Sequence, residues 1–589
     1  MKRQDIDVKY KWKIEDIFSS LAEFEKSLSD LRKSVDFSIF KGKLNNANDI
    51  KNCLDKYYEF YGEFEKLCLY AYMTKDENVG DKKGIELVNK VEDLSLIFDE
   101  NTSFIMPELS MLDEKTLISL SKEESLSDYD LLFLEIAEQK PHILDEKCEA
   151  ILAKSGKVLG GYHDIFSIID NVDLDFPTIK VGDKKVKVTH AKYSELLQNK
   201  DKNVRKKAFK SYYKAYEKVL NTITAIYKGN LDKDVFISKV RNFNSCIERA
   251  LFNEKVDKKV YDSLLKFTHK ALPILHRYVK DRKEILNTNI NMYDMYVPLV
   301  EGQELALDYE EAFSLVKEGL KPLGEDYSKL LQRAHDERWI DVYENDGKRS
   351  GAYSTSAYNV SHPYVLLNHN KTTHSVFTIA HELGHAIHSY KSDRALPMTK
   401  AGYKIFVAEV ASTVNEVLLL KHLIKNAKSL DAKKYYLSYY LDMIRTTLFR
   451  QTMFAEFEYL AHDLCEKGQA ITKETLNALY LKLNKKYYGK HVKSDKEISY
   501  EWSRIPHFYT AFYVYKYATG IISAIAISEK ILSGNKTAID DYFKFLSSGG
   551  SDKPTELLKI TGVDLENEET YRLAFKSFED ALIQFENIK

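Results

Sequence analysis

The sequence predicts a mainly α-helical protein, and three observations support this prediction. Its 589 residues include only 10 prolines and 23 glycines, so residues that interrupt helices are scarce. Hydrophobic residues make up 44% of the chain, enough for a large buried core. No stretch has the composition of a flexible linker. These observations favour one large helical body with subdomains over a string of separate domains.

Helical patterns fill most of the first 170 residues. Ser20 and Glu23 match a capping box, in which serine and glutamate satisfy free backbone N–H groups at the start of a helix. Tyrosine and phenylalanine recur at three- and four-residue spacing from 57 to 72, as on the buried face of a helix. From 176 to 189, apolar and polar residues alternate around Gly182-Asp183, which predicts a β-hairpin. We expect this hairpin to close an N-terminal helical lobe, residues 1–190.

The remaining residues, 191–589, are predicted to form a second and larger domain. Helical periodicity covers about 191–288 and 308–335, and it resumes after 369. Between the last two helical regions, residues 338–369 have an extended pattern with several β-branched and aromatic residues. We therefore expect a small β-sheet directly before the helix that contains residues 381–385.

Charge and cysteine content exclude several classes of function. The chain has 87 Lys and Arg against 89 Asp and Glu, so it lacks the one-signed field that binds nucleic acid or an anionic membrane surface. Five scattered cysteines form neither a disulfide framework nor a CxxC zinc site. The N-terminus lacks the apolar segment of a signal peptide, and the longest apolar run, 518–528, is too short to cross a bilayer. We expect a cytoplasmic protein; no pattern indicates its oligomeric state.

The most specific motif is His381-Glu382-Leu383-Gly384-His385. Its histidines are four residues apart, so a helix projects both imidazoles from one face, where they can bind one tetrahedral Zn²⁺. Glu382 lies beside them and can take a proton from an attacking water. Thr372 or Thr373 can cap this helix. Its apolar stripe on another face consists of Val376, Ala380, Leu383 and Ile387. The alternative is an ordinary helix with two exposed or core histidines.

A second helical segment, residues 406–419, offers a third ligand. Glu409 and Glu416 share one face with Ser412 and Thr413, whereas the other faces are apolar. Carboxylates in a mostly buried helix need compensation, which a metal and its histidines would supply. We predict Glu409 as the third zinc ligand and Glu416 as the carboxylate that orients a ligating imidazole. The alternative is a solvated helix face with two glutamates.

His388 is a competing ligand, because it follows His385 by three residues. Three ligands from one short helical segment would strain a tetrahedral site. We therefore expect His388 behind the ligands or facing the substrate.

A third cluster lies at residues 505–520. Its five aromatic side chains with polar atoms are His507, Tyr509, Tyr513, Tyr515 and Tyr517. Tyr513 and Tyr517 are separated by one helical turn. Hydrolysis of a peptide develops an oxyanion, for which a phenol is a suitable hydrogen-bond donor. The alternative is an aromatic core helix.

Together these motifs resemble the thimet-type zinc oligopeptidases, specifically their oligoendopeptidase F branch. The stretches that carry the resemblance occur in the expected order along the whole chain: 10–18, 347–353, 362–369, 381–388, 406–412 and 505–509. The resemblance implies an almost wholly helical fold in which two lobes flank a deep channel with zinc on its floor. Such a channel admits short peptides and excludes folded proteins.

The resemblance also assigns roles to residues. It places one zinc per chain on His381, His385 and Glu409, with Glu382 as general base. It assigns His507 to substrate contact and the oxyanion-stabilising tyrosine to the run 513–517, with Tyr517 favoured over Tyr513.

The extended region fits this resemblance as a strand that pairs with the backbone of the substrate. The candidate residues are Gly351, Ala352 and Tyr353, with residues 364–368 as a second candidate strand. The alternative is that both strands only brace the zinc helix.

We therefore predict a cytoplasmic zinc metalloendopeptidase of short peptides. One alternative is an exopeptidase with the same zinc site, a carboxypeptidase or dipeptidase. Another is a non-catalytic helical scaffold that binds peptides; the complete set of His381, Glu382 and His385 argues against it.

Overall fold

The structure is a computed structural model that describes residues 1–300, 302 and 304–588, apart from the side chain of Glu146. It divides into two compact units, each assembled from three segments of the chain. Unit 1 comprises Met1–Pro141, Glu304–His422 and Ile527–Val563, and unit 2 comprises His142–Gln303, Leu423–Ala526 and Asp564–Lys589. The predicted division into residues 1–190 and 191–589, and the predicted channel flanked by two lobes, stay predictions.

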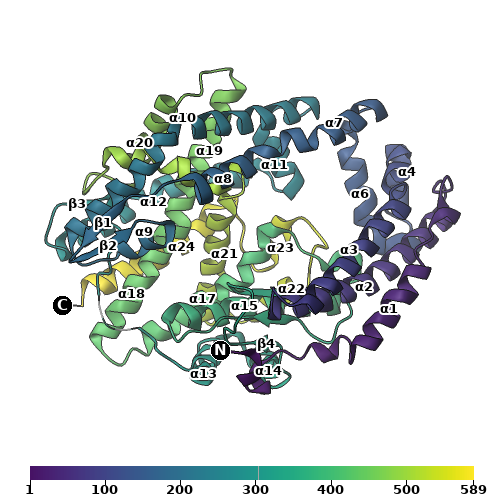
Figure 1. The fold of residues 1–589 in the computed structure, drawn as a ribbon, viewed down its shortest axis with the longest axis horizontal. Coiled ribbons are helices and arrows are strands. Elements are labelled where there is room, and N and C mark those ends of the chain that lie inside the picture. The colour runs from purple at the N-terminus through teal and green to yellow at the C-terminus, as the bar shows by residue number, and fades with distance from the viewer. Residues whose placement is uncertain (301, 303, 589) are drawn as a thin grey trace. The chain divides into compact units, whose positions relative to one another are not determined.

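Unit 1 is mainly helical, as the sequence predicts. Its helices are α1 (Leu21–Lys33), α2 (Ala47–Glu77), α3 (Lys82–Thr102), α4 (Ile105–Met111), α5 (Glu114–Leu120), α6 (Asp130–Gln139), α13 (Tyr309–Gly319), α14 (Glu325–Asp336), α15 (Thr373–Ala395), α16 (Met398–Ala401), α22 (Ala538–Leu546), α23 (Pro554–Ile560) and most of α17 (Ile405–Lys425). Helix α2 packs against both α1 and α3 (Figure 1). The capping serine predicted at residue 20 accepts a hydrogen bond from the backbone of Glu23, and α1 begins there.

Unit 2 is built around α10, a helix of 39 residues (Figure 1). Its helices are α7 (Glu146–Leu159), α8 (Gly161–Ile168), α9 (His190–Leu197), α10 (Lys202–Val240), α11 (Cys246–Glu254), α12 (Lys258–Ile285), α18 (Leu430–Ile444), α19 (Arg450–Glu466), α20 (Lys473–Tyr488), α24 (Glu568–Glu586) and most of α21 (Tyr515–Leu532). None of the helices among the described residues is both long and apolar enough to cross a membrane.

Unit 2 also contains two small sheets. Strands β1 (Thr178–Val181) and β2 (Lys184–Lys187) pair antiparallel across a turn, which confirms the predicted hairpin. Strands β3 (Ile290–Asn291) and β7 (Val492–Lys493) pair parallel and join segments about 200 residues apart in sequence.

The predicted sheet before the 381–385 helix is present in unit 1. It has the order β4-β6-β5, with β4 at Ile340–Asp341, β5 at Tyr353–Thr355 and β6 at Tyr364–Leu366. The central strand β6 is parallel to β4 and antiparallel to β5. Both β5 and β6 contact α15, and Leu69 and Met73 of α2 pack with buried residues of β6. Strand β5 is therefore an edge strand that contacts α15, and the hydroxyl of its Tyr353 donates to Asp76 of α2.

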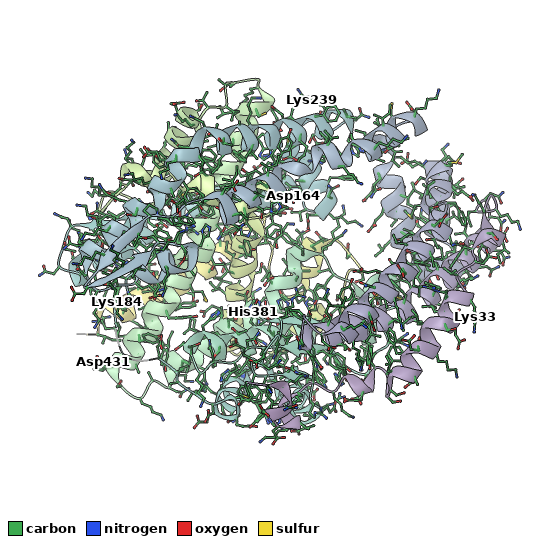
Figure 2. The ribbon with its side chains drawn as sticks, in the orientation of Figure 1. Lys33, Asp164, Lys184, Lys239, His381 and Asp431 are labelled. Atoms are coloured by element: carbon green, nitrogen blue, oxygen red, sulfur yellow. The ribbon has the colours of Figure 1, made fainter. Side chains whose placement is uncertain are left out.

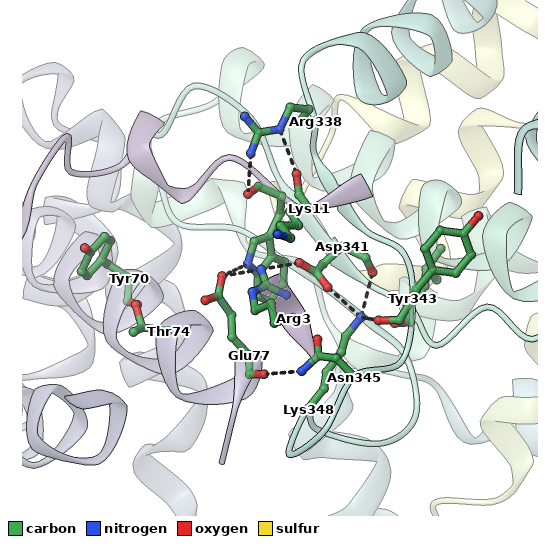
Figure 3. A network of polar contacts seen from close by, with 12 residues as sticks. Arg3, Lys11, Tyr70, Thr74, Glu77, Arg338, Asp341, Tyr343, Asn345 and Lys348 are labelled. Atoms are coloured by element: carbon green, nitrogen blue, oxygen red, sulfur yellow. Dashed lines mark hydrogen bonds and ion pairs between the residues drawn. The ribbon is translucent and has the colours of Figure 1, made fainter. Parts of the chain in front are cut away.

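A buried network of charges fixes this sheet to the N-terminal segment and to α2 (Figure 3). Arg3 donates through Nη2 to Glu77 at the end of α2 and to Asp341 of β4, both at 2.6 Å. The carboxylate of Asp341 also pairs with the ammonium group of Lys348, and Nζ of Lys348 lies 2.7 Å from Oδ1 of Asp341. Lys348 also donates to the carbonyls of Tyr343 and Leu367. This one side chain therefore ties the loop before β5 to β4 and β6.

We predict that Lys348→Met lowers the thermal unfolding midpoint by about 5 °C, because it removes one partner of a buried ion pair and costs about 3–5 kcal/mol. Burial lowers the pKa of Lys348, and Asp341 opposes this shift. Lys371→Met is the matched control: its ion pair with Asp308 is exposed, and we expect almost no change in the midpoint. Equal midpoints for the two variants, measured by calorimetry, would refute the structural role of Lys348.

Candidate metal centre

His381, labelled in Figure 2, lies on helix α15, whose start is fixed by a hydrogen-bonded cap. The Thr372 hydroxyl accepts a hydrogen bond from the Ser375 N–H, and the Ser375 hydroxyl accepts one from the Thr372 N–H. This reciprocal cap fixes where the helix begins. The four residues of the predicted apolar stripe, Val376, Ala380, Leu383 and Ile387, are completely buried.

The packing of α15 against α17 depends on Gly384. A Cβ atom at this position would lie 2.6 Å from Cα of Ser412 and 2.8 Å from the carbonyl oxygen of Ala411, distances too short for any side chain. Asn415 of α17 donates to the carbonyl of Ala380 at 2.9 Å and accepts a hydrogen bond from the Tyr327 hydroxyl. These contacts set both the separation and the register of the two helices.

This packing brings His381, His385 and Glu409 together. The two Nε2 atoms are 3.2 Å apart. Oε2 of Glu409 lies 3.4 Å from Nε2 of His381 and 3.6 Å from Nε2 of His385. The geometry thus brings together the three residues predicted as zinc ligands, and it is the one group of three potential ligand residues found among the described residues.

The spacing of these three atoms fits a tetrahedral metal. Zinc lies about 2.0–2.1 Å from nitrogen and oxygen donors, so two donors at tetrahedral positions are about 3.4 Å apart. The separations of 3.2, 3.4 and 3.6 Å agree with this value. Two imidazoles and one carboxylate are also the donor set of catalytic zinc sites that leave a fourth position open. The residues present therefore fit zinc.

Glu416 contacts one of the predicted zinc ligands, His381. Its Oε1 lies 3.0 Å from Nδ1 of His381, the nitrogen that does not face the ligand cluster. Burial alone would lower the pKa of His381, but the carboxylates of Glu409 and Glu416 outweigh it and raise the pKa to about 10. Hydrogen bonds from both histidines depress the pKa of Glu409 far below its usual range. Without metal, the cluster therefore holds a proton on His381 at neutral pH.

Glu382 is positioned differently from the other acidic residues. Its side chain is 7% exposed and makes no hydrogen bond with the protein among the residues described. Burial raises its pKa, against the opposing effect of His381 and His385. A buried carboxylate that is free of protein partners and has a raised pKa is suited to exchange protons with a reactant.

His388 lies apart from the ligand cluster. It is 1% exposed and stacks on Tyr403 with ring centroids 3.8 Å apart. Burial lowers its pKa to about 3, with a smaller effect from His385, so the ring is neutral. Its predicted place behind the ligands or facing the substrate stays a prediction.

The aromatic cluster of unit 2 separates into buried and partly exposed members. Tyr509 and Tyr515 are 7% and 1% exposed, as expected for an aromatic core. His507, Tyr513 and Tyr517 are only partly buried, and Nε2 of His507 lies 3.3 Å from the Tyr517 hydroxyl. The rings of Tyr513 and Tyr517 are 5.6 Å apart, but Tyr513 precedes α21, so the two are not on one helix as their spacing predicted. The reason is the left-handed conformation of Phe512 (φ 54°), which turns the chain just before the helix.

A buried carboxylate that sequence reasoning missed holds this turn. Glu458 is completely buried, and its Oε1 accepts a hydrogen bond from the Phe512 N–H at 2.7 Å. Burial raises the pKa of Glu458 to about 8, partly opposed by His462. Gly384 and Asn415 were also missed, since no local pattern shows which residues of one helix meet the backbone of another.

The predicted substrate-binding segment lies beside the metal centre within unit 1. Gly351 adopts a left-handed conformation (φ 85°), and its carbonyl accepts a hydrogen bond from Asn368 at 2.8 Å. With Ala352 it lines a cavity of about 200 Å³ whose other walls include His374 and Thr378 of α15. His374 and Thr378 precede His381 by seven and three residues, so they lie on the same helical face. Of the two candidate strands, β6 is paired on both sides, whereas β5, which begins at Tyr353, is an edge strand.

Comparisons with known proteins identify the family of this chain. The model of Peptidase family M3 matches residues 195–577, and that of Oligopeptidase F matches residues 108–176. Oligopeptidase PepF of Bacillus subtilis (strain 168) is 40% identical over 595 residues, an alignment that covers 100% of this chain and 88% of the relative. An oligoendopeptidase F homolog of Borreliella burgdorferi is 37% identical with both chains covered completely.

Solved structures of peptidases also resemble this chain along all or nearly all of its length. A peptidase from Chlamydophila abortus is 33% identical, with a TM-score of 0.95 and complete coverage of both chains. Oligoendopeptidase-F from Enterococcus faecium is also 33% identical, with a TM-score of 0.72 over 96% of this chain and 98% of that one. An HExxH helix with a third ligand from the next long helix defines a metallopeptidase. The chain belongs to peptidase family M3.

We predict that Gly384→Ala lowers stability by about 1–3 kcal/mol, because the new methyl group forces α15 and α17 apart. It also weakens zinc binding, since Glu409 moves away from the histidines. The matched control is Gly156→Ala in α7, where a Cβ has open space; there alanine is neutral or stabilising. Thermal unfolding and zinc titration of both variants test this. Wild-type zinc affinity in Gly384→Ala would contradict it.

Zinc affinity should depend on pH. Because the pKa of His381 is raised to about 10 in the metal-free site, zinc must displace a proton throughout the neutral range. The apparent affinity should rise about tenfold per pH unit between pH 6 and 8. Competition titrations against a zinc-binding dye measure this slope. An affinity that is constant over this range would show that His381 carries no proton to displace.

Proposed function

We propose that the chain is a zinc metalloendopeptidase that hydrolyses internal bonds of short peptides. The observation that carries this proposal is the cluster of His381, His385 and Glu409, whose donor atoms have the spacing of tetrahedral zinc ligands. Zinc, one per chain, is proposed from this donor set, and the choice of short peptides follows the names of relatives such as Oligopeptidase PepF. The cytoplasmic location stays a prediction, in keeping with five cysteines that are all free.

Zinc at this site would act as a Lewis acid that activates water and polarises the scissile carbonyl. Glu382 then accepts the proton of the attacking water, because its carboxylate is next to the ligands and has no protein partner. The same group, once protonated, delivers the proton to the leaving amine. Burial raises the pKa of Glu382, which makes its carboxylate a stronger base for the first step.

Two further groups of residues are proposed to act on the peptide. Tyr517, assisted by Tyr513 and His507, donates a hydrogen bond to the developing oxyanion. Burial and the charge of Arg450 lower the pKa of His507, so its ring stays neutral and can act as donor or acceptor. The edge strand β5 and the preceding Gly351 and Ala352 pair with the peptide backbone. A groove of about 550 Å³ between this edge and α2 supports that assignment.

The proposal is tested with quenched fluorescent peptides that are blocked at both ends, in a series of lengths and with or without a chelator. We expect internal cleavage that the chelator abolishes and that zinc restores, with products identified by mass. Glu382→Gln should lower kcat by at least about 10²-fold while zinc stays bound. Cleavage of unblocked peptides alone would favour the exopeptidase. Absence of both zinc and turnover would favour the non-catalytic scaffold.

The tyrosines of the 513–517 run can be distinguished by removal of single hydroxyl groups. Tyr517→Phe should lower kcat by about 10²–10³-fold with little change in KM, since an oxyanion donor acts only in the transition state. Tyr509→Phe is the matched control, because this tyrosine belongs to the same 505–520 cluster but is buried. If Tyr513→Phe loses more activity than Tyr517→Phe, the oxyanion role belongs to Tyr513 instead.

A further inference from the structure

Unit 2 contains two arginines that share one carboxylate. Arg450 begins α19, and Arg504 ends the 3₁₀ segment Lys496–Arg504. Each donates through Nη2 to the same atom, Oε1 of Glu501, at 2.7 Å. The Tyr480 hydroxyl donates to the other oxygen of Glu501. Two guanidinium groups against one carboxylate leave this cluster with one excess positive charge.

The excess charge is largely shielded from water. The side chains of Arg450 and Arg504 are 15% and 21% exposed, and that of Glu501 is 4% exposed. Burial would raise the pKa of Glu501, but the two arginines outweigh it and lower the pKa to about 2, so the carboxylate stays ionised. Within the described chain, Nε and Nη1 of Arg450 donate to no protein atom. Besides Glu501, Arg450 lies over the Phe454 ring at 4.3 Å, and Nε of Arg504 donates to the Tyr213 hydroxyl at 3.3 Å. Neither partner carries a negative charge, so an anionic ligand would complete the pairing of the excess cation.

Arg450 and Arg504 both line a cavity. Its volume is about 280 Å³. Its buried walls are Tyr193, Leu197, Phe209, Tyr213, Met292 and Ile498. The exposed residues Ser194 and Gln198 form its rim. A concave, mainly apolar space with a few convergent polar groups is typical of a ligand site.

The backbone at Arg450 is also unusual. A π-helical turn, Arg445–Phe449, separates α18 from α19 and ends directly before Arg450. Such turns often occur at functional sites. The first residue of the turn, Arg445, is buried and bonded to Asp442 at 2.8 Å, whereas Arg450, directly after the turn, lines the cavity. Arg450 is also close enough to His507 for its charge to act on that ring.

We propose that this cavity is a subsite that binds a carboxylate of the peptide substrate through Arg450 and Arg504, and this proposal rests on the proposed peptidase function. A guanidinium group matches a carboxylate with two parallel hydrogen bonds. One excess positive charge favours a monoanion over a phosphate dianion. Peptides carry such a group in two places, at the C-terminus and on acidic side chains. The apolar walls would take the neighbouring atoms of the same residue.

The test uses two pairs of peptides of one length. In the first pair the C-terminus is a free acid or an amide; in the second pair, both amidated, an internal residue is glutamate or glutamine. We expect the wild type to favour the carboxylate form of at least one pair in kcat/KM by about tenfold or more, the value of a charge-assisted hydrogen bond. The favoured pair identifies the source of the carboxylate. No preference in either pair would overturn the proposal.

Arg450→Met should reduce the preference for the carboxylate peptide to about twofold or less, because one of the two guanidinium groups is lost. Glu501 keeps Arg504 and Tyr480 as partners in this variant. Arg450→Lys keeps the positive charge but loses the planar guanidinium group, so we expect an intermediate preference. This variant also serves as the test if Arg450→Met does not fold. Arg277→Met is the matched control, since this arginine of unit 2 pairs with Glu586 on the surface. A preference that persists in both Arg450 variants would overturn the subsite.

Binding separates this proposal from the peptidase proposal. The same peptides, labelled with a fluorophore, are titrated against Glu382→Gln and against Glu382→Gln with Arg450→Met, and anisotropy is measured. We expect tighter binding of the carboxylate form only when Arg450 is present. If no peptide is cleaved but this binding preference is found, the peptidase function fails and the subsite stands. Equal binding of all peptides would refute the subsite whatever the turnover.

Discussion

The close contact between α15 and α17 is the constraint on which the metal centre depends. One helix can supply two histidines on adjacent turns, but a third tetrahedral donor has to come from another element. The backbone of α17 comes so near to Gly384 that no side chain fits there. Asn415 then fixes the register by bonding the carbonyl of Ala380. With separation and register set, Glu409 reaches both histidines of the proposed zinc site and Glu416 reaches the outer nitrogen of His381.

Buried charges elsewhere organise the surroundings in a similar way. In unit 1, Lys348 and Asp341 link strands β4 and β6 with the loop that precedes β5. In unit 2, Glu458 holds the turn before α21 by accepting from the Phe512 N–H. Each of these polar groups is costly to bury, and each is compensated by a charged or hydrogen-bonded partner. They fix the loop before β5 and the turn before α21 in a directional geometry that apolar packing alone does not specify.

The sequence predicted most of what depends on local periodicity. The helical class, the hairpin near Gly182, the helix that carries His381 and the cluster with Glu409 all follow from patterns within one or two helices. What could not be predicted depends on contacts between distant segments. Tyr513 and Tyr517 have helical spacing, yet the left-handed Phe512, held by its bond to Glu458, turns the chain so that α21 begins only after Tyr513. The sharing of Glu501 by two arginines likewise arises from tertiary packing.

The most direct measurement is X-ray absorption at the zinc edge of the purified protein, combined with metal analysis. The packing of α15 against α17 predicts about one zinc per chain, with two imidazole ligands and further light donors about 2.0–2.1 Å from the metal. In Glu409→Ala the occupancy should fall at limiting zinc, because one of three protein ligands is lost. Zinc bound without imidazole scattering, or full occupancy in Glu409→Ala, would contradict the three-ligand site.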